Sequence, residues 1–365
     1  MNHPEGGRSA NDKLAAAARK LLENASVGAS QSFVLRLWNG ERVVFGPAEE
    51  NPVEIVIGSP RAMRQILLRP RIATFAELYA TGEIDALDMH PLELVRRIDH
   101  VKMRASLRGI SIWRAFADAL PILMARSAPG SETALAFSGA QAASPAAGRN
   151  DSSLIQFHYD VSNRFYAQFL DPQMVYSCAY FEREDMSLED AQAAKLELIC
   201  RKLRLQKDDR LFDPGCGWGA LICHAAEKYG VKAHGVTLAK EQFDYCQVLI
   251  AARGLQDRVT VELRDYRSVE ANESFDKIAQ IEMFEHVGLD NQENHFRHMH
   301  ALLRPRGTYL HQASTRRATP NLADFAKPTA YQKFTTRYIF PGGALDHIGM
   351  TVTNLERLGF EVHDV

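Results

Sequence analysis

The sequence lacks several features that would assign a protein to a class at once. Its five cysteines form no CxxC pair and no even set, so neither a structural zinc site nor a disulfide framework is indicated. The formal net charge of -2 gives no basic excess of the kind that nucleic-acid binding requires. No stretch of about 18 uninterrupted apolar residues occurs, and the first residues show no signal-peptide pattern. We therefore expect a cytoplasmic protein that binds no nucleic acid.

The chain has 365 residues, of which 46% are hydrophobic, so it can bury a large core and two domains are expected. Residues 33–45, FVLRLWNGERVVF, place Asn39 and Gly40 between two apolar arms, a hairpin signal in which both turn residues favour positive φ. VEIVIG at 53–58 predicts another strand, and Ser59 with Pro60 predicts a helix start. We predict a small α+β module over residues 1–125.

The end of this module is basic and helical in pattern. Residues 91–126 interleave apolar residues with Arg96, Arg97, Lys102, Arg104, Arg108 and Arg114. This pattern fits either an ordinary solvated helix face or a helix that adsorbs to anionic lipid. Residues 126–150 are rich in Ala, Ser, Gly and Pro without an apolar period, and they predict a flexible linker between the module and a domain over 151–365.

The second domain alternates predicted strands and helices. Strands are expected in RLFDP, VKAHGVTL, RVTVELRD, FDKIAQIEM and GTYLHQA, with helices after the first two and at 291–303. Such alternation predicts an α/β fold, a parallel sheet covered by helices on both faces. Ligands bind such sheets beyond the carboxyl ends of the strands.

The stretch LFDPGCGWGALI, residues 211–222, connects the first of these strands to the next helix. Gly215, Gly217 and Gly219 form GxGxG, which is neither the dinucleotide fingerprint GxGxxG nor a nucleotide P-loop, because no Gly-Lys-Ser/Thr follows. A glycine turn lets backbone amides approach a ligand closely. With Asp213 at the strand end, the pattern indicates a nucleoside cofactor without a pyrophosphate, such as S-adenosylmethionine.

Six ordered motifs carry a family resemblance. HYDVSNRFYAQFLDPQMVYSCAYF (158–181), DPGCGWG, GVTLAKEQ (235–242), RDYR (264–267), MFEHVG (283–288) and YIFPGG (338–343) resemble the cyclopropane-fatty-acid synthase family. FVLRLWNG and LYATGEID (78–85) are similar to the amino-terminal module of its longer bacterial members. The resemblance implies a class I methyltransferase sheet with a smaller lipid-binding module that also provides a possible homodimer contact.

The activity implied by this family is transfer of a methyl group from S-adenosylmethionine to a cis double bond of a phospholipid acyl chain in the membrane, giving a cyclopropane. An alkene is a poor nucleophile, so a dry pocket must align it, and the carbocation must then lose a proton. In the family a bound bicarbonate accepts that proton, held by groups that map to Cys178, mainly through its backbone, Glu285 and His311. The enzyme would work as a peripheral protein on the inner membrane face.

The resemblance also assigns a cofactor site. Tyr176 and Ser177 would cap the methionine end, while Thr237, Leu238 and Gln242 follow the second strand, where nucleoside folds usually place an acid. Asp265 and Tyr266 end the third strand and would meet the adenine. The full cofactor set is Tyr176, Ser177, Asp213, Gly215, Cys216, Gly217, Thr237, Leu238, Gln242, Asp265 and Tyr266.

Three histidines, His295, His298 and His300, invite a metal reading. They lack the i, i+4 pairing of HExxH, and no carboxylate completes a ligand set, so we assign no metal and expect a solvated helix face.

The chain departs from the family in two places. Ala313 stands where a branched apolar residue is usual beside the bicarbonate, and the sequence stops at GFEVHDV. We expect the helix TVTNLERLG and a strand after it, but neither the last strand nor the tyrosine that members supply from that region, as in a truncated or divergent member. Two alternatives stay open: a methylase that leaves a methyl branch on the acyl chain, and a non-catalytic lipid-binding homologue.

Overall fold

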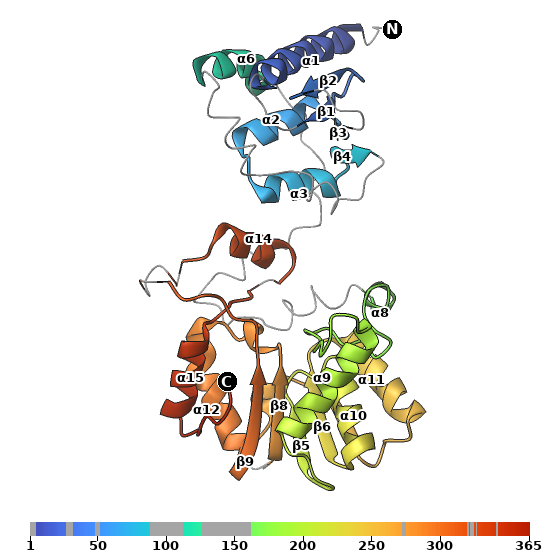
Figure 1. Cartoon of the computed structure of the whole chain (residues 1–365), viewed down its shortest axis with the longest axis vertical. Coiled ribbons are helices and arrows are strands. Elements are labelled where there is room, and N and C mark those ends of the chain that lie inside the picture. Colours follow the sequence, from blue (N-terminus) through green and yellow to red (C-terminus); the bar gives the residue numbers. More distant parts are fainter. Residues whose placement is uncertain are drawn as a thin grey trace. The chain divides into compact units, whose positions relative to one another are not determined.

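The computed structural model describes residues 5–26, 32–47, 52–87, 112–125, 162–271, 275–319, 321, 325, 327–340 and 342–365 (Figure 1). The chain divides into two compact units, Met1–Ala136 and Phe137–Val365. Of the segments named above, the predicted linker at 126–150 and the basic residues Arg96, Arg97, Lys102, Arg104 and Arg108 lie outside the described residues.

The first unit is built on a four-stranded sheet in the order β2-β1-β3-β4. Its elements are α1 (Glu5–Ser26), β1 (Phe33–Arg36), β2 (Arg42–Phe45), β3 (Val53–Ile57), α2 (Pro60–Leu68), α3 (Ile72–Ala80), β4 (Ile84–Leu87) and α6 (Ile112–Met124). The predicted hairpin and the predicted helix start are confirmed: β1 pairs antiparallel with β2, and the Ser59 side chain accepts the Ala62 amide at the start of α2. The turn differs in one respect, because only Gly40, and not Asn39, has a positive φ.

The second unit holds a sheet of five parallel strands in the order β7-β6-β5-β8-β9. These strands are β5 (Arg210–Asp213), β6 (Lys232–Thr237), β7 (Val259–Leu263), β8 (Phe275–Ile281) and β9 (Leu303–Gln312). The helices are α8 (Asn163–Tyr166), α9 (Leu188–Lys202), α10 (Ala220–Tyr229), α11 (Lys240–Ala252), α12 (Gln292–Leu302), α14 (Ala330–Tyr338) and α15 (Ile348–Arg357), with short 3₁₀ turns η2 (Tyr266–Ser268), η3 (Phe284–His286) and η4 (Leu289–Asn291). The predicted α/β alternation is confirmed.

Consecutive residues of β5 show how this sheet is covered on both faces. Leu211 packs into a core with α9, α10 and α11, whereas its neighbour Phe212 packs with Met299 and Leu302 of α12. Both side chains are fully buried, as expected when adjacent residues of a central strand point to opposite faces. Figure 1 shows α9, α10 and α11 on one side of the sheet and α12 and α15 on the other. The site described below lies at the carboxyl edge of the sheet, where ligands bind in this architecture.

The carboxyl-terminal prediction is half right. The helix predicted from TVTNLERLG is present as α15, but residues 359–365 form no strand. A strand needs a neighbour for its backbone hydrogen bonds, and no described segment pairs with these residues. Phe360 instead packs against the rings of His300 and Tyr309.

Within the described part of the chain, no helix combines the length and the apolar character that crossing a bilayer would require.

Candidate cofactor cavity and buried polar network

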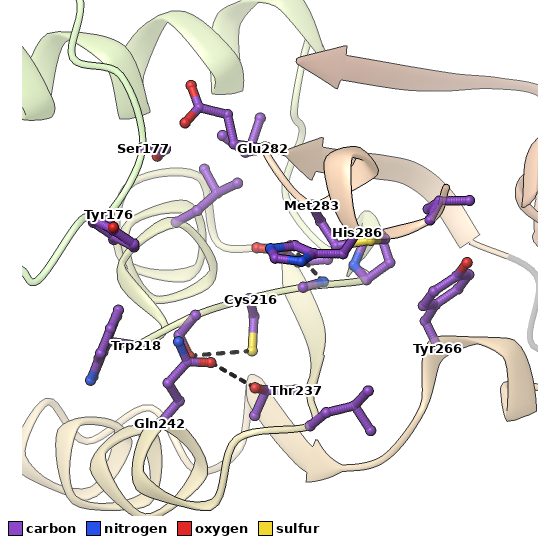
Figure 2. A pocket seen from close by; sticks show the side chains of 18 of the residues that line it. Tyr176, Ser177, Cys216, Trp218, Thr237, Gln242, Tyr266, Glu282, Met283 and His286 are labelled. Carbon is purple, nitrogen blue, oxygen red and sulfur yellow. Dashed lines mark hydrogen bonds between the residues drawn. The ribbon is translucent and has the colours of Figure 1, made fainter. Parts of the chain in front are cut away.

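A cavity of about 490 Å³ opens at the carboxyl ends of β5, β6, β7 and β8. Every residue that the sequence assigns to the cofactor lines it: Tyr176, Ser177, Asp213, Gly215, Cys216, Gly217, Thr237, Leu238, Gln242, Asp265 and Tyr266. In Figure 2, Tyr176 and Trp218 lie on the opposite side of this cavity from Tyr266, with Met283 and His286 between them. The parallel sheet thus brings four separate sequence motifs to one place.

The glycine turn forms one wall of the cavity. The Cys216 amide donates to the Val236 carbonyl at 3.1 Å, which fastens the turn to β6. Gly217 has φ +54°, and a Cβ at this position would meet no atom within 4 Å. A left-handed backbone facing open space is suited to the close approach of a ligand. α10 begins directly after the turn, so its first amides point toward the same region.

Asp213 lies at the bottom of this wall, and only 3% of it is exposed. It accepts the Gly215 amide at 3.4 Å, and burial raises the pKa of its carboxyl to about 7. The buried Lys195 donates to Ser177 Oγ at 2.5 Å, and burial lowers the pKa of its ammonium to about 8. The cavity therefore holds a carboxyl and an amine that both titrate near neutral pH, a pattern enriched at functional sites.

The end of β6 carries no acid, as the sequence indicated. Thr237 Oγ1 donates to Gln242 Oε1 at 2.7 Å and accepts the Ala239 amide at 3.1 Å. This pair fixes the Gln242 side chain, so that its amide nitrogen is the group left to meet a ligand hydroxyl.

At the end of β7, Asp265 and Tyr266 are both engaged with neighbours. Burial would raise the pKa of Asp265, but hydrogen bonds from the Arg267 side chain and amide outweigh it, and the pKa is lowered. The Tyr266 hydroxyl lies 3.0 Å from Nδ1 of His295. Asp265 is thus an ionised acceptor at the cavity wall.

The three residues predicted to be catalytic do not line this cavity. Glu285 lies in η3 and is half-buried; its Oε1 accepts the Ser314 amide at 2.6 Å, its buried Oε2 has no partner, and burial raises its pKa. His311 lies near the end of β9, where Nε2 is likewise buried without a partner and burial lowers the pKa to about 4. Glu285 and His311 belong to neighbouring strand ends, and the Phe284 ring packs edge-on against the His311 ring at 4.8 Å.

Cys178 differs from both, because it is exposed and its backbone amide is already taken. That amide donates to Oε1 of Glu282 at 3.0 Å. A separate hydrogen bond between the Cys178 side chain and Glu282 is the main reason that the pKa of the thiol is raised. A raised pKa disfavours the thiolate, and the role predicted for the backbone of Cys178 stays a prediction.

Glu282 is a cavity residue that sequence reasoning missed. It lines the cavity beside Ser177, receives the Cys178 amide and the Gln312 side chain (3.0 Å each), and has φ +49°, a value rarely adopted outside glycine (Figure 2). Its position three residues before Glu285 was the only available signal. Lys195 was also missed, because a lysine within a helical pattern is normally predicted to be exposed to solvent.

Aromatic residues also missed from the sequence close the side of the cavity opposite Tyr266. Trp218 is almost fully buried, donates from its indole nitrogen to Asn163 Oδ1 at 2.7 Å, and packs against Tyr166 at 4.9 Å between ring centroids. Tyr166 in turn packs edge-on against Tyr176 at 5.3 Å. This cluster places α8 and the segment before α9 over the glycine turn.

The expectation of a solvated histidine face on α12 is wrong for His295. Only 3% of His295 is exposed; it hydrogen-bonds Tyr266 through Nδ1 and Gln280 through Nε2. His298 is partly buried and bonds the Tyr266 carbonyl, while His300 is exposed. α12 covers the sheet with the face that carries His295, which its mixed polar sequence did not reveal. Among the residues described, no cluster of His, Cys, Asp and Glu suits a metal ion.

Comparisons with known proteins agree on one family. A model of the mycolic acid cyclopropane synthetase family matches residues 147–365. A "Probable fatty acid methyltransferase" of Pseudomonas putida is 39% identical over 219 residues, which cover 60% of this chain and 54% of that protein. "Cyclopropane mycolic acid synthase 1" of Mycobacterium tuberculosis is 39% identical over 216 residues, 57% of this chain and 74% of that protein. The chain spans about half the length of the first of these relatives.

Solved structures show the same relationship. A crystal structure of mycolic acid cyclopropane synthase CmaA1, complexed with SAH and CTAB, superposes with a TM-score of 0.54 at 38% identity, over 58% of this chain and 76% of that one. The cyclopropane synthase MmaA2 of Mycobacterium tuberculosis also gives a TM-score of 0.54, at 37% identity and the same coverage.

Proposed function

The chain belongs to the mycolic acid cyclopropane synthetase family, and from this premise we propose that it transfers a methyl group from S-adenosylmethionine to the cis double bond of an unsaturated phospholipid acyl chain, closing a cyclopropane ring. The observation that carries the proposal is the convergence of the glycine turn, Asp213, the Thr237–Gln242 pair and Tyr266 on one cavity of about 490 Å³. A cavity of this size suits a nucleoside-sized ligand.

The residues of this cavity fit S-adenosylmethionine, which supplies an electrophilic methyl group on a sulfonium. The open backbone at Gly217 admits the methionine portion, and Asp213 together with the Ser177–Lys195 pair offers partners for its ammonium and carboxylate. Gln242 and Asp265 offer partners to the ribose and adenine, beside the ring of Tyr266. The related synthase that was crystallised with SAH supports this assignment.

The aromatic cluster of Tyr166, Tyr176 and Trp218 would keep water from the methyl donor. Tyr166 and Trp218 are each 2% exposed. Because a carbocation next to water would be captured as an alcohol, exclusion of water decides whether a ring can form. Because the sulfonium of the donor is already an activated leaving group, the protein contributes by aligning the alkene with the methyl group and by excluding water.

We further propose that Glu285 and His311 hold a bicarbonate that accepts the proton lost on ring closure. Glu285 Oε2 and His311 Nε2 are both buried, and neither has a hydrogen-bond partner among the described residues. A buried polar atom without a partner costs about 1–3 kcal/mol, and bicarbonate, which carries one hydrogen, would relieve that cost at one of these two atoms by donating its hydroxyl. The third group, the Cys178 amide, is engaged by Glu282 and would join only if that carboxylate moved.

For the approach to lipid, we propose that α6 lies on the membrane surface. One face of this helix carries four exposed apolar side chains: Trp113 (84% exposed), Phe116 (55%), Leu120 (44%) and Met124 (75%). Exposed apolar stripes of this kind mark interaction surfaces, and the lipid interface accepts Trp and Met well. Changing Trp113 and Met124 to serine should abolish co-sedimentation with anionic vesicles; unchanged co-sedimentation, or loss of a dimer in ultracentrifugation instead, would contradict the membrane assignment.

A second product is supported by one comparison. The Pseudomonas putida relative is named a fatty acid methyltransferase and not a cyclopropane synthase, and it matches as many residues of this chain. The alternative product is an acyl chain with a methyl or methylene branch, formed when the proton leaves from another position.

The deciding experiment uses methyl-¹³C S-adenosylmethionine and vesicles of dioleoyl phosphatidylglycerol and phosphatidylethanolamine. Carbon NMR of the extracted acyl chains separates a ring CH₂ from an exocyclic CH₂ and from a methyl branch. We expect the ring signal. Calorimetry with S-adenosylmethionine alone tests the remaining alternative, because a lipid-binding homologue without turnover would show neither heat of cofactor binding nor labelled lipid.

A further inference from the structure

A chain of buried and half-buried polar side chains runs from the cavity wall to His311. Gln280 of β8, with none of its surface exposed, lies between His295 of α12 and Tyr309 of β9. Tyr309 in turn contacts Nδ1 of His311 at 3.1 Å, and His295 contacts the cavity residue Tyr266. All of these side chains are placed on rigid elements, so their hydrogen atoms have few alternative arrangements.

The amide oxygen of Gln280 fixes the direction of these hydrogen bonds. It lies 2.9 Å from His295 Nε2 and accepts the hydroxyl of Tyr309. A carbonyl oxygen can only accept, so His295 must carry its hydrogen on Nε2. Its Nδ1 then accepts the hydroxyl hydrogen of Tyr266 at 3.0 Å.

The same rule determines the ring of His311. Tyr309 has one hydroxyl hydrogen, and it is given to Gln280. The contact between Tyr309 and His311 is therefore a hydrogen bond only if Nδ1 of His311 carries a hydrogen and donates it to the tyrosine oxygen, 3.1 Å away. Oε1 of Gln280, 3.4 Å from the same nitrogen, is a second acceptor for that hydrogen. Burial lowers the pKa of His311 to about 4, so the ring is neutral at physiological pH and Nε2 has no hydrogen.

We propose that Gln280 and Tyr309 are positioning residues that hold His311 as its Nδ1–H tautomer and so leave the buried Nε2 as a hydrogen-bond acceptor for a ligand that carries an O–H group. The significance of this for an anion rests on the function proposed above. A bicarbonate would meet His311 with its hydroxyl, whereas nitrate, of similar size and shape but without a hydrogen, would find no partner there.

The tautomer can be measured without any turnover. The full chain is labelled with ¹⁵N-histidine and examined by long-range nitrogen–proton NMR at about pH 8, above the ordinary histidine pKa of about 6.5. His311→Gln assigns the signal. His298 is an internal reference for the opposite tautomer, because its Nε2 faces the Tyr266 carbonyl oxygen at 3.0 Å and must carry the hydrogen.

We expect Nδ1–H for His311 in the unaltered protein and a mixture with Nε2–H in Tyr309→Phe, which removes only one oxygen. Gln280→Leu should also give a mixture of tautomers. Gln280→Glu, which keeps an acceptor oxygen in place, should retain Nδ1–H. An Nε2–H signal in the unaltered protein would overturn the proposal, and so would an Nδ1–H signal that Tyr309→Phe leaves unchanged.

Activity provides the second readout. Tyr309→Phe should lower methyl transfer roughly tenfold or more at unaltered cofactor affinity, the size of effect seen when a metal-ligating histidine loses the hydrogen-bond partner that orients it. Tyr229→Phe is the matched control, since its hydroxyl bonds Glu197 outside this network. Added nitrate should not compete with bicarbonate; competition at equal concentration would contradict the proposal. If the NMR result holds but no lipid is methylated, the proposed function fails while the tautomer stands.

Discussion

Oε1 of Glu282 accepts the backbone amide hydrogen of Cys178 at 3.0 Å, although the two residues lie 104 positions apart. The contact ties the end of β8 to the segment before α9, across the mouth of the cavity. Glu282 makes it while its backbone adopts φ +49°, a conformation that costs a residue with a Cβ roughly 1–2 kcal/mol.

The first prediction separates this backbone strain from the hydrogen bonds. Glu282→Ala and Glu282→Gly both lose the carboxylate, but glycine alone adopts φ +49° without strain. The free energy of unfolding from urea titration should be about 1 kcal/mol higher for the glycine variant than for the alanine variant. Equal stability of the two would show that the backbone relaxes when the carboxylate is removed.

The second prediction concerns the stability cost of Asp213. Burial raises its folded-state pKa to about 7, so the folded protein loses stability as pH rises from about 4, the unfolded value, to 7. Asp213→Asn should therefore raise the free energy of unfolding of the ligand-free protein at pH 8 by on the order of 2–4 kcal/mol, and its melting temperature with it. At pH 5.5 the increase should be smaller. A lower melting temperature at pH 8 would mean that the ionised carboxylate has a stabilising partner.

The third prediction links the same carboxyl to cofactor binding. A cationic ligand prefers ionised Asp213, so affinity for S-adenosylmethionine should rise between about pH 5.5 and 7, by at most tenfold per unit, with release of a proton. Calorimetry in buffers of different ionisation enthalpy measures that proton. Asp213→Asn should bind more weakly and show a flat profile; a pH dependence that persists in this variant would place the titrating group elsewhere.

The fourth prediction separates proton removal from cofactor binding. Glu285→Gln keeps the bond from the Ser314 amide but replaces a carboxyl group, which can take up a proton, with an amide, which cannot. Methyl transfer should fall about 100-fold or more, while the dissociation constant for S-adenosylmethionine changes little, because Glu285 does not line the cavity. Glu293→Gln, on an exposed turn of α12, is the control. Parallel loss of cofactor affinity would assign Glu285 to the cofactor site instead.

The fifth prediction concerns acid stability. Burial lowers the pKa of His311 to about 4 and that of His295 to about 3, while the unfolded chain takes up these protons near pH 6.5. Stability that is complete above pH 6.5 is therefore lost as pH falls toward 4. His311→Gln should flatten this loss by up to about 1.4 kcal/mol per pH unit relative to the unaltered protein, in urea titrations. Protonation of Asp213 stabilises the folded protein over the same pH range, so the quantity to compare is the difference in unfolding free energy between His311→Gln and the unaltered protein. His363→Gln, at an exposed histidine, is the control.

The sequence alone determined the α/β alternation and the position of the glycine turn at the end of its first strand. Both depend on local order: apolar periodicity defines the strands, and parallel strands bring all their carboxyl ends to one edge. Asp213 ends β5 and the glycine turn follows it, while Gln242 and Tyr266 lie in α11 and η2, shortly after β6 and β7. Their place at this edge followed from the order of the strands, and their assignment to the cofactor came from the family resemblance.

Tertiary structure decided what depends on a partner distant in sequence. The exposed or buried state of His295 was set by which face of α12 packs on the sheet, and the segment at 359–365 is no strand because no described segment pairs with it. Glu282 and Gln280 look like ordinary strand residues until β9 and the Cys178 segment are beside them. Hydrogen-bond direction and desolvation arise only when these groups are brought together away from water, and no local pattern encodes that.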